Sequence, residues 1–185
     1  MGNVNQEKGG VMFVILVAME KEAQYIHCPN AMVIVTGIGL NNVVRTLSRA
    51  LIEGKISEKD VFINVGYAGS SCFNIGDVVG VNQVRRLRPS ETVNEGTYSI
   101  FFSDDYIDKV APCYTSDDFY EGSRAIPLVD MELFYIRAFF KHLIAFKIVS
   151  DNLKANEYEE FNPRKAWAKT NDILNNIVNK NQKVL

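Results

Sequence analysis

The sequence predicts an α/β protein in which a central mixed sheet is covered by helices on both faces, a three-layer α/β/α arrangement. Short apolar runs, such as residues 11–17 and 61–65, lack the polar alternation of a half-exposed strand, so we expect strands that are buried on both faces. Between these runs, apolar residues recur every three or four positions, which is the spacing of a helix with one buried face.

The length and composition predict one globular domain. The chain has 185 residues, of which 47% are hydrophobic and 23% charged, enough for a sizeable core. We expect residues 1–10, which are polar and glycine-rich, to be frayed, and residues 11–185 to form the domain. The net charge of −2 argues against a nucleic-acid partner or an anionic membrane surface. No apolar run is long enough for a membrane span and none has the layout of a signal peptide, so we expect a cytoplasmic protein.

The cysteines and histidines do not predict a metal site. Cys28, Cys72 and Cys113 are odd in number and widely spaced, so neither a disulfide framework nor a zinc motif is indicated. His27 and His142 stand far apart, without the spacing of metal ligands. We therefore expect free thiols, no metal and no cofactor.

The first half of the chain predicts strands that alternate with helices. We expect strands at residues 11–17 and 32–36, with a helix from Glu20 between them. A second helix begins at Leu40, after the Gly-Ile-Gly turn at 37–39, and ends near Gly54. The strand that follows, from residue 61, should run parallel to the strand before this helix.

The second half is predicted with less regular elements. We expect strands at residues 78–84, 98–102, 126–129 and 144–149, a polar loop at 89–96 and a brief helix from Ser103 through Val110. A largely buried helix should run from Asp130 to about His142. The Asn-Pro pair at 162–163 predicts the start of a final amphipathic helix.

The stretch at residues 61–69 is the place where we expect a pocket. Gly66 and Gly69 follow a buried strand, and open α/β sheets bind ligands at the carboxyl ends of their strands. A tight turn without a ligand is the alternative. Three acids, Glu22, Glu132 and Asp151, stand where other strands end or helices begin. Each could be a simple helix cap, but together they could converge on one cleft and divide into acid and base roles.

Five short motifs, in the same order along the chain, resemble those of 5'-methylthioadenosine/S-adenosylhomocysteine nucleosidases, members of the purine nucleoside phosphorylase/nucleosidase superfamily. The motifs are Ala-Met-Glu-Lys-Glu at 18–22, Gly-Ile-Gly at 37–39, Asn-Val-Gly-Tyr-Ala-Gly at 64–69 followed by Gly-Asp-Val-Val at 76–79, Val-Asp-Met-Glu at 129–132, and Val-Ser-Asp at 149–151. The resemblance implies a phosphorylase/hydrolase-like fold, a homodimer, and hydrolysis of an adenine nucleoside in methionine salvage.

The resemblance also implies a role for each matching position. Asp151 would be the general acid that protonates the purine at N7, and Glu22 would orient or deprotonate the attacking water. Glu132 would hold the ribose hydroxyls. The other implied substrate-binding positions are Met131 on the sugar, Phe119 and the backbone of Tyr120 on the adenine, and Tyr67, Ala68, Gly69, Ser150 and Lys147.

The sequence departs from the family pattern at several points. Tyr67 replaces a serine of the family, Lys147 replaces an arginine, and the loop at 89–96 is short. A phosphate-dependent phosphorylase is one alternative, although phosphate prefers several cationic donors and only Lys147 and Arg45 stand within reach. We also expect the bulky Tyr67 to crowd that space. A purine-binding protein without catalytic activity is the other alternative.

Overall fold

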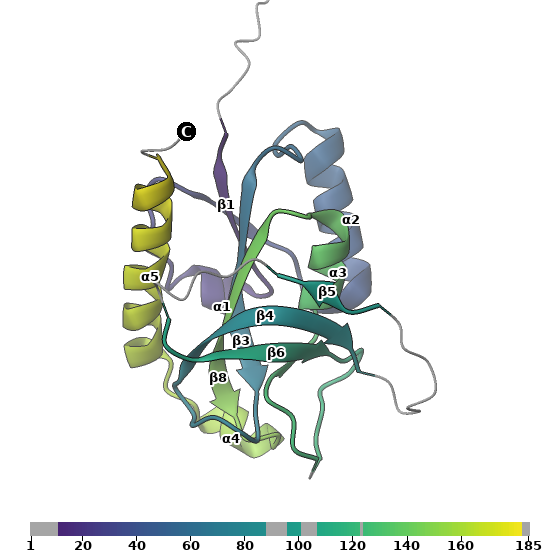
Figure 1. Cartoon of the computed structure of the whole chain (residues 1–185), viewed down its shortest axis with the longest axis vertical. Helices are drawn as coiled ribbons and strands as arrows, with labels where there is room; N and C mark the ends of the chain where they lie inside the picture. Colours follow the sequence, from purple (N-terminus) through teal and green to yellow (C-terminus); the bar gives the residue numbers. More distant parts are fainter. Residues whose placement is uncertain (1–10, 88–95, 101–106, 123, 183–185) are drawn as a thin grey trace, which may run out of the picture.

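The computed structural model describes residues 11–87, 96–100, 107–122 and 124–182, with the backbone alone for 181 and 182. In these residues, eight strands form one mixed sheet in the order β2-β1-β3-β7-β6-β4-β5, and β8 pairs with both β3 and β4 (Figure 1). The predicted α/β class with a mixed sheet is confirmed. The strands are β1 (Phe13–Val17), β2 (Met32–Val35), β3 (Val61–Gly69), β4 (Val78–Arg86), β5 (Tyr98–Ser99), β6 (Val110–Thr115), β7 (Val129–Asp130) and β8 (Leu143–Asp151).

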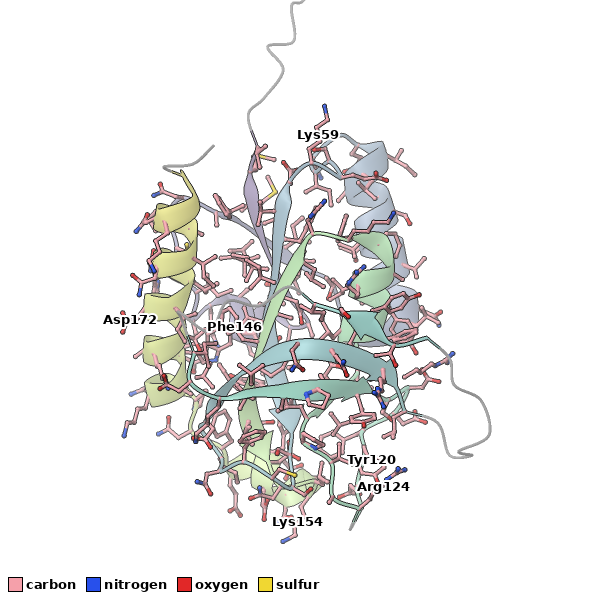
Figure 2. The ribbon with its side chains drawn as sticks, in the orientation of Figure 1. Lys59, Tyr120, Arg124, Phe146, Lys154 and Asp172 are labelled. Atoms are coloured by element: carbon pink, nitrogen blue, oxygen red, sulfur yellow. The ribbon has the colours of Figure 1, made fainter. Side chains whose placement is uncertain are left out.

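The helices lie on both sides of the strands, with α2 and α3 on one side and α5 on the other (Figure 1). The described helices are α1 (Glu20–Ala23), α2 (Gly39–Ile52), α3 (Leu133–Phe139), α4 (Ala155–Glu160) and α5 (Arg164–Gln182). Successive residues of β3 face opposite sides: Phe62 joins the core under α2 and α3, and Ile63 joins the core under α5. Phe146 points into the second of these cores (Figure 2).

The parallel strands bring three segments to one edge of the sheet. β1 pairs in parallel with β2 and β3, as predicted, and β3 pairs in parallel with β8. The carboxyl ends of β1, β3 and β8 therefore lie together, and the segments that follow β1 and close β8 carry Glu22 and Asp151. β4 runs antiparallel to β8. The topology thus gathers the motifs that are far apart in the sequence.

The predicted boundaries hold best where the pattern was regular. The helix from Leu40 is α2, and α5 follows Pro163, whose carbonyl accepts the first helical hydrogen bond from Trp167. Asn162 caps this helix, since its side-chain oxygen accepts a hydrogen bond from the Arg164 amide. The helix expected from Asp130 to about His142 spans Leu133–Phe139 instead, because Asp130 belongs to β7.

Two predictions about irregular segments were wrong, and one short element was missed. Residues up to Val110 were expected to be helical, but Val110 opens β6, because pairing with β4 buries every second side chain of the segment. The strand expected at residues 126–129 covers only Val129–Asp130. The short helix α4 was not predicted, because its sequence has no apolar periodicity and none of its residues is buried. Residues 1–10, 89–95 and 101–106, with the predictions made for them, lie outside the described part.

Candidate active site

A hollow of about 170 Å³ lies at the carboxyl edge of β1, β3 and β8, and all three predicted acids line it. Glu22 comes from the segment after β1, Glu132 from the turn between β7 and α3, and Asp151 from the end of β8. An adjoining hollow of about 30 Å³ is lined by Tyr120 and shares Asp151 with the first. The other predicted positions in the larger hollow are Tyr67, Ala68, Gly69, Phe119, Met131, Lys147 and Ser150. The predicted convergence is therefore present.

The carboxylate of Glu22 is held by three backbone amides. Its Oε2 accepts hydrogen bonds from the N–H groups of Ala18 (2.9 Å) and Met19 (2.8 Å), and its Oε1 accepts one from Tyr67 (3.0 Å). Burial raises the pKa of Glu22, and these amides with the nearby Lys147 cation oppose the shift. The result is a fixed carboxylate, only 1% exposed, at the wall of the hollow.

Gly66 is the position that makes room for this carboxylate. The tight turn that stood as the alternative is absent, because β3 continues as a strand paired with β8 through Gly69. A β-carbon on Gly66 would stand 2.8 Å from Glu22 Oε1, and one on Gly69 would stand 2.8 Å from Asp151 Oδ1. Both glycines therefore serve close approach by a carboxylate rather than a turn.

Asp151 sits in a different environment from Glu22. Its Oδ2 accepts a hydrogen bond from the Ser150 hydroxyl (2.8 Å) and its Oδ1 accepts one from the Leu153 amide (2.9 Å). Burial raises the pKa of Asp151, and these two donors partly oppose the shift. Leu153 has a φ of 64°, a left-handed conformation that is unusual for a leucine and turns its amide back onto the acid. The raised pKa makes Asp151 easier to protonate, and a protonated carboxyl can act as an acid.

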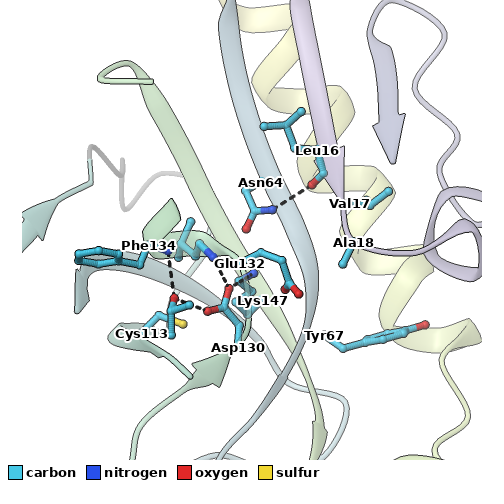
Figure 3. Close-up of polar contacts among 12 residues, drawn as sticks. Leu16, Val17, Ala18, Asn64, Tyr67, Cys113, Asp130, Glu132, Phe134 and Lys147 are labelled. Carbon is cyan, nitrogen blue, oxygen red and sulfur yellow. Dashed lines mark hydrogen bonds and ion pairs between the residues drawn. The ribbon is translucent and has the colours of Figure 1, made fainter. Parts of the chain in front are cut away.

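Glu132 belongs to a buried charged group with Asp130 and Lys147 (Figure 3). Lys147 Nζ lies 2.7 Å from Asp130 Oδ2, and Asp130 also accepts hydrogen bonds from the Thr115 hydroxyl and the Leu133 amide. Glu132 Oε1 accepts a hydrogen bond from the Gly39 amide (2.9 Å). Burial, together with repulsion from Asp130, raises the pKa of Glu132 to about 7. Burial is the largest single effect on Lys147 and lowers its pKa, but the nearby acidic groups, led by the Asp130 carboxylate, together outweigh it, so the net shift is upward.

The sequence led us to expect that Tyr67 would crowd the space near Lys147. The structure shows instead that Tyr67 leaves the space between Lys147 and Glu132 free of its ring. Its ring extends away from both (Figure 3), and its phenol oxygen accepts a hydrogen bond of 2.8 Å from Trp167 Nε1 on α5. The ring packs edge-on against Tyr158, Phe161 and Trp167. Tyr67 therefore borders the hollow while its ring lies on the α5 side of the sheet.

The loop that carries Phe119 is attached to β4 and α3 by charged and polar contacts. Arg86 at the end of β4 lies 2.7 Å from Asp117, and the hydroxyl of Tyr135 on α3 also hydrogen-bonds to Asp117. Phe119 itself is 45% exposed and stands edge-on to Tyr158. The loop thus places an accessible aromatic ring at the mouth of the hollow.

Several lining residues were not predicted. Asn64 and Asp130 line the hollow but were not predicted as site residues, although both stand inside the motifs quoted above. A polar amide within the otherwise apolar start of β3 was a signal that could have identified Asn64. Tyr158 belongs to α4, whose helical character was itself missed. Gly66 borders the hollow, as the sequence predicted, and the remaining unpredicted lining residues are Ala18, Met19, Ile38, Val65 and Val129.

The described residues hold neither a cluster of metal ligands nor a helix that could span a membrane. Among them, no group of three or more histidine, cysteine or acidic side chains could hold a metal ion. Within the same ranges, no helix is both long and apolar enough to cross a membrane.

Comparisons with known proteins give matches in structure but not in sequence. No family model matches the chain, and no curated protein matches it. A solved 5'-methylthioadenosine/S-adenosylhomocysteine nucleosidase from Helicobacter pylori, with 5'-methylthioadenosine in its active site, superposes with a TM-score of 0.71 at 16% identity, covering 93% of this chain and 100% of that one. The nucleosidase of Chlamydia trachomatis bound to the same nucleoside gives 0.71 at 18% identity, over 92% and 99% of the two chains.

Futalosine hydrolase of Helicobacter pylori gives a TM-score of 0.71 at 17% identity, over 92% of this chain and 98% of the hydrolase. The structural neighbours thus include nucleosidases with different named substrates. The resemblance to these nucleosidases, which was inferred from five short motifs, is supported by the three-dimensional structure. The chain has the fold of the 5'-methylthioadenosine/S-adenosylhomocysteine nucleosidases.

Proposed function

We propose that this protein hydrolyses the N-glycosidic bond of an adenine nucleoside, such as 5'-methylthioadenosine or S-adenosylhomocysteine, and releases adenine. The observation that carries this proposal is the convergence of Glu22, Glu132 and Asp151 on one hollow, each in a different environment. Cleavage of this bond develops positive charge on the ribose and negative charge on the purine. Carboxylates stabilise the first charge, and a proton donor neutralises the second.

Asp151 is the general acid in this proposal. Its raised pKa, which results from burial, favours the protonated form that donates to the purine N7. Two neighbours support this role. Gly69 allows close approach of the Asp151 carboxylate, and the Ser150 hydroxyl donates a hydrogen bond to it. Phe119 and Tyr120 border the same end of the hollow, so we place the adenine ring between these aromatic residues and Asp151.

Glu22 and Glu132 act on the ribose side. Glu22, fixed by three amides, accepts the proton of the attacking water, by the logic of a two-carboxylate glycosidase. Glu132 accepts hydrogen bonds from the ribose hydroxyls, and Met131 packs on the sugar. Lys147 offsets the charge of Asp130 beneath them, while Tyr67 and Ala68 border the site from β3.

Hydrolysis is favoured over phosphorolysis by the charges that line the hollow. Among the described lining residues, Lys147 is the one cation, and it already pairs with Asp130. Arg45, the other cation considered from the sequence, donates to Asn42 and lines a separate groove with Met32 and Glu53. Phosphate binding normally uses several such donors.

The proposal also includes a homodimer in the cytoplasm, a role in methionine salvage and the three-layer phosphorylase/hydrolase-like arrangement.

The test is adenine release from 5'-methylthioadenosine by the purified protein, with and without phosphate. We expect a rate that is independent of phosphate and falls at least a hundredfold in Asp151→Asn. The control is Asp172→Asn, which removes an exposed carboxylate that points outward from α5 (Figure 2). A rate that requires phosphate would show a phosphorylase. Nucleoside binding without release would show a purine-binding protein that is not an enzyme.

A further inference from the structure

We propose that the side-chain carbonyl of Asn64 holds the attacking water, so that this water is oriented by Asn64 and Glu22 together. The inference rests on the hydrolase proposal and adds a residue and a geometry to it. Asn64 is 2% exposed and lines the hollow from β3. It is a polar side chain within a strand that is otherwise apolar at this depth.

The hydrogen bonds of Asn64 identify the atom that faces the hollow. Its Nδ2 donates to the backbone carbonyl of Leu16 over 3.0 Å, which fixes the orientation of the amide group. Its Oδ1 is buried and has no hydrogen-bond partner. Buried polar atoms are almost always paired, so an unpaired acceptor beside a hollow indicates a donor that arrives from outside the protein.

The pleat of β3 places this acceptor on the same face as the Glu22 carboxylate. Asn64 and Gly66 are two residues apart, so their side-chain directions share one face of the sheet. A β-carbon on Gly66 would stand 2.8 Å from Glu22 Oε1. Lys147 on β8 pairs with Gly66 on β3, and its ammonium group is bound to Asp130. Asn64 and Glu22 therefore flank one pocket in the sheet surface.

We expect a single water molecule to bridge these two acceptors. Positions two residues apart on a strand are separated by about 6.6 Å, and two hydrogen bonds of about 2.8 Å span most of that distance. Asn64 lies further from the carboxyl edge than Gly66, so it is at the base of the hollow, where the smallest donor fits. The ribose hydroxyls are assigned to Glu132, on another wall.

This arrangement orients the water for attack. One hydrogen of the water points to Glu22 and the other to Asn64 Oδ1, which leaves an oxygen lone pair for the anomeric carbon. The new carbon–oxygen bond forms as the bond between that carbon and purine N9 breaks, and its electron pair moves into the purine. Asp151 supplies the proton to N7, and Glu22 takes the proton from the water. The products are adenine and the free sugar.

Two variants and one structure test the assignment. Asn64→Leu removes the acceptor at nearly constant volume, and Asn64→Asp keeps an oxygen that faces the hollow; both lose the donor to Leu16. We expect kcat for adenine release to fall at least tenfold in Asn64→Leu, with KM and the Kd for adenine unchanged within twofold. We expect Asn64→Asp to retain more activity than Asn64→Leu although it loses the same bond to Leu16. Equal losses in both, or a loss that appears only in KM, would overturn the proposal.

The second measurement does not depend on activity. A high-resolution crystal structure with an unreactive nucleoside analogue should show a water molecule within hydrogen-bond distance of Asn64 Oδ1 and the Glu22 carboxylate. A ribose hydroxyl at Asn64, or no ordered donor there, would refute the inference. If the wild-type protein releases no adenine from any adenine nucleoside, the proposed function fails instead, and the water position still tests Asn64 separately.

Discussion

Glu22 Oε1 and Gly66 approach each other so closely that a β-carbon on the glycine would stand 2.8 Å from the oxygen. The carboxylate would therefore have to move in Gly66→Ala and would lose its 3.0 Å hydrogen bond from the Tyr67 amide. Because the clash meets the end of a side chain, we expect a stability loss under about 2 kcal/mol. We expect adenine release to fall at least tenfold.

Gly96→Ala is the matched control for this substitution. The nearest heavy atom to a β-carbon there is 4.0 Å away, so the added methyl group finds space. Steady-state kinetics and urea unfolding of both variants check the prediction. Full activity in Gly66→Ala would show that the position of Glu22 does not matter.

Glu132 should make stability depend on pH. Its pKa is about 7 in the folded chain against a reference of 4.5, because burial and Asp130 disfavour its charge. Between these values the unfolded chain has released a proton that the folded chain retains, so this contribution to stability is present below about pH 4.5 and is lost as the pH rises towards 7. Relative to Glu132→Gln, the wild-type protein should lose about 3 kcal/mol of unfolding free energy between pH 4 and 8.

Urea denaturation of the wild-type protein and Glu132→Gln across this pH range measures the difference. Parallel stability curves for the two proteins would mean that Glu132 ionises normally in the folded state.

The buried pair of Lys147 and Asp130 should be costly to break. Lys147→Met leaves the Asp130 carboxylate buried without its cation, at a cost of about 3–5 kcal/mol. Replacing both partners, as Lys147→Met with Asp130→Asn, should recover part of this loss because the buried charge is gone. The exposed pair of Lys154 and Glu157 is the control, and Lys154→Met should cost less than about 1 kcal/mol. Equal costs for the two single lysine variants, measured by urea unfolding, would contradict the prediction.

Tyr135→Phe should affect substrate binding through the Phe119 loop. The substitution removes the hydroxyl that hydrogen-bonds to Asp117, while the Arg86 contact remains. We expect stability to fall by about 1 kcal/mol and KM to rise severalfold, with a smaller change in kcat. Tyr98→Phe, on β5 against Phe134, is the comparison and should leave KM unchanged. An unchanged KM in Tyr135→Phe would mean that this contact does not position the loop.

Trp167→Phe should lower stability without changing catalysis. It removes the donor to the Tyr67 hydroxyl and part of a side chain that is 1% exposed. We expect a stability loss of about 2–3 kcal/mol, measured by urea unfolding, with kcat and KM unchanged within twofold at a temperature where the variant is folded. A fall in kcat of the folded variant would show that the α5 side of Tyr67 supports the chemistry after all.

The sequence was a good guide where one periodicity extended over many residues. The apolar spacing of α2, the continuous apolar runs of β1 and β8 and the Asn-Pro start of α5 each gave the correct element. The sequence failed at β6, where Pro112 and the short length hide the alternation and where pairing with β4 decides the conformation. It also failed at α4, which has a polar sequence.

In the candidate site too, features set by the local sequence could be predicted and contacts between distant residues could not. The three acids were found because each stands at the boundary of an element, and parallel strands bring such boundaries together. The face to which Tyr67 points could not be predicted, because it depends on the strand continuing through Gly69 and on Trp167, a hundred residues later. Asp130 was seen as a helix start, and only the structure shows its pairing with Lys147.

Asn64 and Tyr67 lie three residues apart on β3 and face opposite sides of the sheet, one towards the hollow and the other towards Trp167. Trp167→Phe, on the α5 side, is therefore expected to change heat tolerance without altering turnover, while Asn64→Leu, on the other side, is expected to alter turnover. In directed evolution the two properties could be selected independently, and a library confined to α5 would yield sturdier proteins with the original substrate preference.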